Sequence, residues 1–264
     1  MKITVFTSNQ SRHLSLISSL AEVADTVYAV QESATLFPGK IEDFYRNTPV
    51  MREYFSHVIE AETEVFGVPG FLPANVHQLS CKIGDASYLP EEILSDALDS
   101  DLYVVFGASY IKGWLCDFLV EKNAINIHMG TSPYYRGHSC NFWALYEGNP
   151  DYVGATVHYL SKGLDSGPML FHAFPDASGN NAFELGMRAV KAAHKGICKH
   201  IAEGTLLDLP SVAQDKTKEL KYSKGVDFTD AVAEEYLHNM PTTSFIQDKL
   251  DSRSYDHFLC PFVG

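Results

Sequence analysis

Short apolar, β-branched runs alternate with helical patterns along most of this chain, and this alternation limits the fold more than any other feature of the sequence. Strands are predicted over 2–6, 25–31, 101–107, 124–128, 154–160 and 168–174, and helices over 14–24, 37–66, 90–100, 112–122, 139–148 and 181–204. Strands that alternate with helices usually pair in parallel through crossover connections. The sequence therefore predicts an α/β fold in which helices cover a mostly parallel sheet.

The alternating pattern ends near Gly204, which sets the expected domain organisation. A chain of 264 residues has room for one large domain, or for one domain with an appendage. The remaining sequence suggests a linker, a short hairpin and then a helix that begins near Asp227. We therefore predict a core domain over 1–205 and a small C-terminal extension over 206–264.

The composition excludes several broad classes of protein. Apolar residues make up 45% of the chain and charged residues 20%, which suits a soluble globular protein and not a disordered one. No apolar stretch approaches the roughly 20 residues of a membrane-spanning helix, and the N-terminus turns polar too soon for a signal peptide. The five cysteines are scattered and lack zinc-ligand spacing. We expect a cytoplasmic protein without a metal site.

The charge balance concerns the partners of the protein. Lys and Arg total 20 against 33 Asp and Glu, a formal net charge of −13. A protein that grips nucleic acid or docks on an anionic membrane needs a basic face. The sequence therefore predicts no nucleic-acid partner and no membrane partner. A small phosphorylated ligand remains compatible with the charge, because it needs only a local basic pocket.

The side chains best suited to catalysis lie between 124 and 170. Asn126 and His128 are two apart at the end of an apolar strand, so their side chains project from the same face. Ligands gather beyond the carboxyl ends of strands in open parallel sheets. Further along, Gly163 and Gly167 flank Leu164-Asp165, which suggests a tight loop that presents one carboxylate.

An amide, an imidazole and a carboxylate at one sheet edge suit acyl transfer. The Asn126 amide would donate to a developing oxyanion, and the His128 imidazole would carry a proton. The Asp165 carboxylate would orient the imidazole or relay the proton through water. No Ser or Cys nucleophile is required, because an incoming amine can attack. The spacing alone leaves a structural reading open, since Asn-x-His at a strand end and a GLDSG loop are also ordinary structural features.

Four short motifs, in order, resemble the folate-dependent formyltransferases. They are Asn-Ile-His at 126–128, Ser-Pro-Tyr-Tyr-Arg-Gly at 132–137, Thr-Val-His-Tyr at 156–159 and Gly-Leu-Asp-Ser-Gly at 163–167. That family includes methionyl-tRNA formyltransferase, glycinamide ribonucleotide formyltransferase, formyltetrahydrofolate deformylase and the sugar N-formyltransferases. The resemblance implies that 1–205 is a Rossmann-like catalytic domain, that 10-formyltetrahydrofolate is the co-substrate, and that Asn126, His128 and Asp165 are catalytic.

The resemblance also implies that the pterin is held by two loops, at 106–112 and 160–165. Backbone groups and apolar side chains suit a flat ring system with a polar edge. The expected folate-binding residues are Phe106, Gly107, Ser109, Tyr110, Ile111, Leu160, Gly163 and Leu164. For Phe106, Tyr110 and Ile111, plain core packing remains an equally good explanation.

The formyl acceptor is the open question within the family. A methionyl-tRNA enzyme is disfavoured, because the segment after the core is short and acidic. Glycinamide ribonucleotide enzymes have a glycine-rich loop after the first strand, where this chain has Thr-Ser-Asn-Gln-Ser-Arg at 7–12. Deformylases carry a domain before the catalytic one, whereas this sequence opens at the first strand. We therefore expect the primary amine of a nucleotide-linked deoxyamino sugar, as in lipopolysaccharide O-antigen synthesis.

Five residues are expected to contact that acceptor: Asn9, Arg12, Tyr45, Arg46 and Arg136. Asn9 and Arg12 lie at a helix N-terminus that could meet a phosphate, although a capped helix with a solvated arginine explains them as well. The aromatic and basic residues of 37–66 could stack on the nucleotide, or could simply pack an amphipathic helix on the sheet. Aromatic residues at the C-terminal end could form a homodimer contact.

Two readings outside the family stay open. One is a metal hydrolase that uses His128, His158 and Asp165, although no HxxxH pairing supports it. The other is a nucleotide-sugar-binding protein without catalysis, which the intact set of Asn126, His128 and Asp165 argues against.

Overall fold

One sheet of eight strands organises the part of the chain that the computed structural model describes, residues 1–33, 47–176 and 180–264. Its strand order is β10 (Phe262–Val263), β8 (Met169–Phe174), β7 (Ala155–Tyr159), β5 (Ile125–His128), β4 (Leu102–Val105), β1 (Lys2–Ser8), β2 (Thr26–Ser33), β3 (Val76–Lys82). Neighbours pair in parallel except at β5–β7 and β7–β8. The expected α/β fold with a mostly parallel sheet is confirmed.

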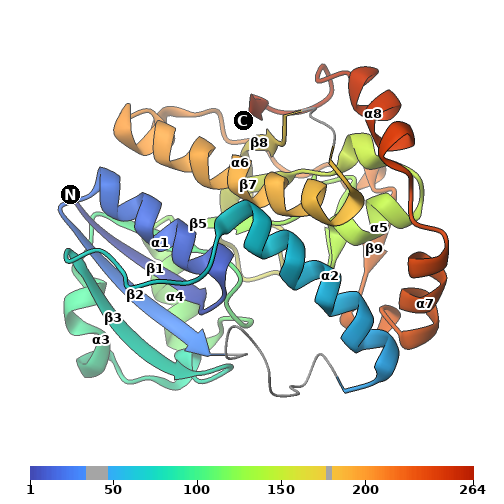
Figure 1. The fold of residues 1–264 in the computed structure, drawn as a ribbon. Coiled ribbons are helices and arrows are strands. Elements are labelled where there is room, and N and C mark those ends of the chain that lie inside the picture. Colours follow the sequence, from blue (N-terminus) through green and yellow to red (C-terminus); the bar gives the residue numbers. More distant parts are fainter. Residues whose placement is uncertain (34–46, 177–179) are drawn as a thin grey trace.

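Helices cover both faces of this sheet, and others pack beside it (Figure 1). They are α1 (Ser11–Val23), α2 (Pro49–Phe66), α3 (Glu91–Leu98), α4 (Gly113–Glu121), α5 (Cys140–Tyr146), α6 (Ala182–Ala202), α7 (Asp230–His238) and α8 (Thr243–Asp251). Short 3-10 turns occupy Ala86–Tyr88, Pro150–Tyr152, Leu206–Asp208, Lys216–Lys218 and Gly225–Asp227. A separate two-stranded sheet pairs β6 (Tyr135–Gly137) with β9 (Lys221–Ser223).

The alternation of side chains along β1 separates two hydrophobic clusters. Ile3 and Val5 pack in one cluster with Leu16 of α1 and Ile197 of α6. Phe6 belongs to the other cluster, with residues of α3 and α4. Successive strand residues point to opposite faces, so a strand buried on both sides is apolar throughout. This explains why the central strands were visible in the sequence as continuous apolar runs.

Three sequence expectations were wrong in detail. No strand was predicted at 76–82, but this segment forms the edge strand β3, whose outward residues are polar and exposed. The hairpin expected after 205 does not occur in the described residues, because β9 pairs in parallel with β6. The helix of the extension begins at Asp230, where Thr229 accepts a hydrogen bond from the Val232 amide.

The helical prediction over 37–66 holds for its second part. The helix α2 begins after Thr48, whose side chain accepts from the Met51 amide, and Pro49 occupies its first position. Residues 34–46 lie outside the described residues. The apolar face of α2 packs on α6 and α7, with Tyr54 edge-on to Phe142, Phe183 and Phe228.

The extension 206–264 shares its hydrophobic cluster with the rest of the chain. Tyr236 of α7, Leu250 of α8 and Phe258 pack with Trp143 of α5 and Leu185 of α6. Figure 1 shows α7 and α8 along the flank of the molecule beside α5. Across 1–33, 47–176 and 180–264, none of the helices has the length and apolar character that crossing a membrane would take.

Candidate functional site

A cavity of about 1160 Å³ opens beside the carboxyl ends of β1, β2, β4 and β5. Its near wall carries Asn126, His128 and Asp165. It is also lined by every residue expected to bind folate, namely Phe106, Gly107, Ser109, Tyr110, Ile111, Leu160, Gly163 and Leu164. Its far wall is apolar and comes from α2, α5, α6 and α7. The fold thus brings the two predicted loops and the three predicted catalytic residues to one place.

The residues expected to contact the acceptor do not all line this cavity. Arg12 lines the cavity, but its guanidinium Nη1 lies 3.1 Å from Oε1 of the buried Glu62. Asn9 lines a smaller, separate cavity of about 250 Å³. Arg136 does not line the main cavity; it is 8% exposed and donates to Glu219 over 2.9 Å. Tyr45 and Arg46 lie outside the described residues.

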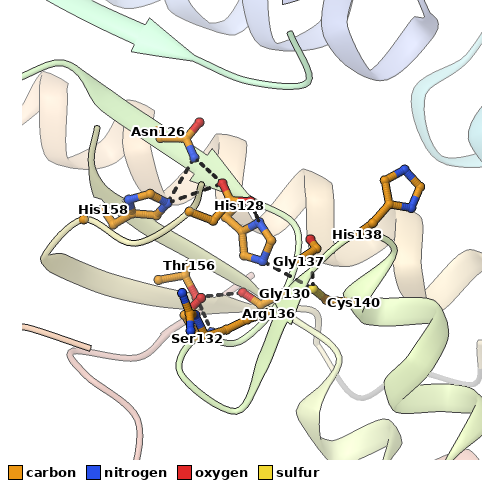
Figure 2. Close-up of polar contacts among 12 residues, drawn as sticks. Asn126, His128, Gly130, Ser132, Arg136, Gly137, His138, Cys140, Thr156 and His158 are labelled. Carbon is orange, nitrogen blue, oxygen red and sulfur yellow. Dashed lines mark hydrogen bonds and ion pairs between the residues drawn. The ribbon is translucent and has the colours of Figure 1, made fainter. Parts of the chain in front are cut away.

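Asp165 joins the other two predicted catalytic residues through separate oxygens. Its Oδ2 lies 3.2 Å from Nδ1 of His128, and its Oδ1 accepts from Nδ2 of Asn126 over 2.9 Å. Asn126 and His128 are both nearly buried on β5, at 8% and 7% exposure. Because they are two residues apart on one strand, they present their side chains to the same carboxylate. Figure 2 shows the side chains of Asn126 and His128 beside each other.

The loop that carries Asp165 depends on a close backbone approach. Asp165 itself has a positive φ of 43°, a conformation that Asp adopts more readily than most residues. A Cβ at Gly167 would overlap the backbone carbonyl oxygen of Tyr159. At Gly163 the overlap would be with the Ser166 hydroxyl, which can rotate away. The tight loop expected from the two glycines is present, and Gly167 is the position that requires glycine.

His158 is a site residue that the sequence analysis did not assign to this chemistry. It lies on β7 directly opposite Asn126, with its Nε2 3.0 Å from Asn126 Nδ2. Burial lowers the pKa of His158 to about 4, so the ring is neutral at pH 7. Its Nδ1 contacts the Tyr159 carbonyl over 2.8 Å and must therefore carry the proton, which leaves Nε2 as an acceptor. Only the antiparallel register of β5 and β7, which spacing does not reveal, could have identified it.

Cys140, the first residue of α5, was also missed. Its Sγ lies 3.4 Å from Nε2 of His128 and 3.4 Å from the carbonyl oxygen of Gly137. Gly130 makes this contact possible, because a Cβ there would clash with Cys140 and with His128. The loop between β5 and α5 thus folds back onto the strand that precedes it, and His128 is held between Asp165 and Cys140. Figure 2 shows the contact between His128 and Cys140.

The electrostatics make His128 and Asp165 a charged pair. Burial disfavours a charge on either group, but the Asp165 carboxylate, together with Cys140, raises the pKa of His128 well above its usual value. Burial also opposes ionisation of Asp165, but the charge and hydrogen bond of His128 outweigh it and lower the pKa of Asp165 to about 2. At neutral pH the pair is an imidazolium facing a carboxylate.

The hydrogen-bond directions decide what each group can offer a ligand. Both N–H groups of Asn126 are used, one by Asp165 and one by His158. Rotating the amide would set its oxygen against two acceptors, so Asn126 Oδ1 must face away from them, as Figure 2 shows. The other N–H of the charged His128 ring points at sulfur, a weak acceptor that an oxyanion could displace. His128 is therefore the better placed oxyanion donor, whereas from the sequence we expected Asn126 in that role and His128 as the proton carrier.

The metal-hydrolase alternative gains no support from this geometry. His128 Nδ1 and His158 Nε2 both lie near Asp165, at 3.2 and 3.9 Å from its oxygens. Within the described ranges, however, no three His, Cys, Asp or Glu side chains are grouped so that they could hold a metal ion.

Comparison with known proteins gives matches of two kinds. Residues 92–201 match the family described as formyl transferase. The chain is 29% identical over 137 residues to methionyl-tRNA formyltransferase from Agathobacter rectalis, a match covering 50% of this chain and 43% of that protein. It is 30% identical over 108 residues to the same enzyme from Trichormus variabilis, covering 38% of the chain and 32% of the relative. The matches thus span less than half the length of these curated relatives.

Solved structures share the fold at low sequence identity. A sugar N-formyltransferase from Shewanella sp. aligns with a TM-score of 0.51 at 16% identity, over 86% of this chain and 78% of that one. The formyltransferase PseJ from Anoxybacillus kamchatkensis, solved with UDP-4,6-dideoxy-4-formamido-L-AltNAc and tetrahydrofolate, aligns with a TM-score of 0.51 at 18% identity. That alignment covers 95% of this chain and all of PseJ.

Proposed function

Because the chain belongs to the formyl transferase family through residues 92–201, we propose that it transfers a formyl group from 10-formyltetrahydrofolate to a primary amine. The observation that carries this proposal is the meeting of Asn126, the charged His128 and Asp165 in one cavity with the two expected folate loops. The cavity of about 1160 Å³ is large enough for a folate and a second ligand side by side.

The geometry supports a direct attack by the amine on the formyl carbon. Asn126 Oδ1 would accept one N–H of the neutral amine and aim its lone pair. The Nε2–H of His128 would leave Cys140 Sγ for the oxygen that becomes negative, and Asp165 would keep the imidazolium charged. As the bond from the formyl carbon to folate N10 breaks, His128 would pass a proton to N10 and recover one from the new amide nitrogen.

We further propose that the amine belongs to a nucleotide-linked deoxyamino sugar. The far wall of the cavity offers Phe55 of α2, Phe183 and Met187 of α6, and Phe228, which suit the methyl group of a deoxy sugar and the face of a base. The net charge of −13 weighs against a large polyanionic acceptor. PseJ, which shares the fold along the whole of its length, was solved with a ligand of this class.

Methionyl-tRNA is a second candidate acceptor, favoured by one observation. The curated relatives with the matches above are methionyl-tRNA formyltransferases. The same apolar wall would accept a methionyl side chain. The acidic composition counts against it, because tRNA binding draws on Lys and Arg contacts to phosphates.

The test is an assay of the purified chain with 10-formyltetrahydrofolate and a panel of amines. The panel contains dTDP-, UDP- and GDP-linked amino sugars and methionyl-tRNA, and mass spectrometry identifies the formylated product. Formylation of an amino sugar, with His128→Ala slower by about 100-fold or more, is the expected result. Formylation of methionyl-tRNA alone would replace the sugar proposal. Binding of a nucleotide sugar without turnover would leave only a binding protein, and product formed equally well without folate would end the proposal.

A further inference from the structure

Glu32 is a buried acidic residue that the catalytic scheme does not use. It lies near the end of β2, is 1% exposed, and lines the cavity beside the first expected folate loop. Its Oε1 accepts from the Gly84 amide over 2.9 Å and from the Ala86 amide over 3.3 Å. The same oxygen accepts from the Ser109 hydroxyl over 2.8 Å, and Oε2 accepts from the Ser109 amide over 2.6 Å.

These four bonds connect the end of β2 to two loops at the sheet edge. Glu32 lies within β2, Gly84 and Ala86 follow β3, and Ser109 lies in the loop after β4. A buried carboxylate is costly to desolvate, and neutral donors that already point at it recover that cost through charge-assisted bonds. Compared with an apolar residue at this position, the carboxylate fixes the orientation of two loops, because their amide N–H groups point at it.

The first folate loop is tied down at two further points. The Lys112 amide donates to the Ser87 hydroxyl over 3.0 Å, so the far end of the loop rests on the same turn after β3. The Tyr110 hydroxyl donates to the carbonyl oxygen of Lys162 over 2.8 Å. This last bond links the loop 106–112 to the loop 160–165, which carries Asp165.

We propose that Glu32 is a positioning residue for the folate co-substrate, acting through Ser109 to fix the shape of the loop 106–112. This inference rests on the proposed function and deepens it. The residues of that loop that line the cavity include Gly107, Ser109 and Ile111. The pterin would meet their backbone groups and apolar surfaces, so a change in loop shape weakens folate binding. The reacting groups on β5 are not held by Glu32, so the rate at saturating folate is preserved.

The informative substitution is Glu32→Gln, which keeps the size of the side chain. We call Glu32 and the groups of Gly84, Ala86 and Ser109 that donate to it the clamp. An amide has one oxygen and one donor group, so at least one backbone N–H of the clamp would face another N–H. Ser87→Ala is a milder second variant, since it removes only the partner of the Lys112 amide. Glu147→Gln is the matched control: Glu147 accepts from Tyr135 and Lys221, lies outside the cavity lining, and touches neither folate loop.

Two measurements test the proposal: the Kd of 5-formyltetrahydrofolate by titration calorimetry, and KM and kcat for 10-formyltetrahydrofolate. Glu32→Gln should raise the Kd and KM for folate roughly tenfold, with kcat within about threefold of wild type. Ser87→Ala should raise the Kd by roughly threefold, which keeps the test usable if Glu32→Gln does not fold. The control should bind folate as the wild type does.

The outcomes separate this inference from the function it rests on. If the wild type binds folate and both Glu32→Gln and Ser87→Ala bind it within twofold of wild type, the clamp has no role in folate binding. The same conclusion follows if Glu147→Gln weakens binding as much as Glu32→Gln does, because the effect would then be general loss of stability. If the wild type binds no folate, the proposed function itself fails, and the inference with it.

Discussion

The Asn126 amide donates to Nε2 of His158 across the antiparallel pair β5–β7, with 3.0 Å between the two nitrogens. His158 is neutral, since burial lowers its pKa to about 4, and its other nitrogen is fixed on the Tyr159 carbonyl. A second N–H of Asn126 is held by Asp165. His158 and Asp165 therefore act together to fix which end of the Asn126 side chain faces the cavity.

His158→Ala should lower kcat by roughly tenfold, because one buried N–H of Asn126 loses its acceptor and the amide can rotate. His158→Gln should recover part of the loss, since its amide oxygen can accept in place of Nε2. Steady-state kinetics with both substrates saturating would measure this. A wild-type kcat in His158→Ala would show that the orientation of Asn126 does not matter to the reaction.

Asp165→Asn should move the alkaline limit of activity to lower pH by at least about one pH unit. The carboxylate holds the pKa of His128 well above its usual value, and without it burial would lower that pKa. In the proposed mechanism His128 acts in its charged form, so activity at neutral pH should fall. The pH dependence of kcat/KM, with an NMR titration of the His128 ring, gives the answer; an unmoved alkaline limit would contradict the assignment.

The His128–Asp165 pair also predicts how the stability of the fold depends on pH. The raised pKa of His128 means that its contribution is fully present below pH 6.5 and is lost as pH rises through the raised value. The pKa of Asp165, about 2 against 3.8 unfolded, means that its contribution is present above pH 3.8 and is lost as pH falls through about 2. The free energy of unfolding lost in Asp165→Asn should therefore be largest between these limits and should shrink outside them.

Gly167→Ala should destabilise the fold by on the order of 3 kcal/mol, because the new Cβ meets a backbone oxygen that cannot move without shifting β7. Gly163→Ala should cost less, about 1 kcal/mol, since the Ser166 hydroxyl can rotate away. Urea unfolding of the two variants gives the comparison. Equal losses would mean that the loop adapts at Gly167 and that its close approach to Tyr159 is not required.

His194→Leu should stabilise the protein, and more so in acid. His194 is 2% exposed between Phe66 and Phe106, and in the described part of the chain neither ring nitrogen has a hydrogen-bond partner. Burial, with Arg12 nearby, lowers its pKa to about 3 from 6.5. Between pH 6.5 and pH 3 the unfolded chain therefore binds a proton at His194 that the folded chain does not bind. The free energy of unfolding thus decreases as the pH is lowered.

Between pH 7 and pH 5 this linkage costs about 2 kcal/mol at His194. Removing the unpaired ring should add on the order of 1 kcal/mol at pH 7. Urea unfolding at the two pH values would test both parts. A gain in His194→Leu that is no larger at pH 5 than at pH 7 would show that the ring finds a proton partner in the folded state.

The sequence was sufficient where local pattern decides structure. Strands such as β1 are buried on both faces and are visible as apolar runs, and the motif around Asn126 and His128 led to the formyl transferase resemblance that the family match confirms. The edge strand β3 was missed because its outward face is polar and exposed. An edge strand buries too little to leave an apolar signature.

The rest of the site depended on pairings between distant segments. His158 meets Asn126 through strand register, and Cys140 meets His128 because Gly130 lets a loop fold back. Arg136 lies in a motif of the resemblance, yet it is held by Glu219, 83 residues further along the chain, and does not line the cavity. Spacing shows that such residues exist, but their partners are chosen by tertiary packing.

The far wall of the cavity has a consequence for how the protein is made. Phe228 and Tyr236 of that wall come long after Asp165 in the chain, so a ribosome delivers the reacting groups well before it delivers the wall. During that interval the apolar residues of α2, α5 and α6 that pack on Tyr236 in the finished fold lack this partner. The wall proposed to hold the acceptor is therefore complete only once synthesis has passed α7, and apolar helix surface that is exposed until then favours aggregation of the growing chain.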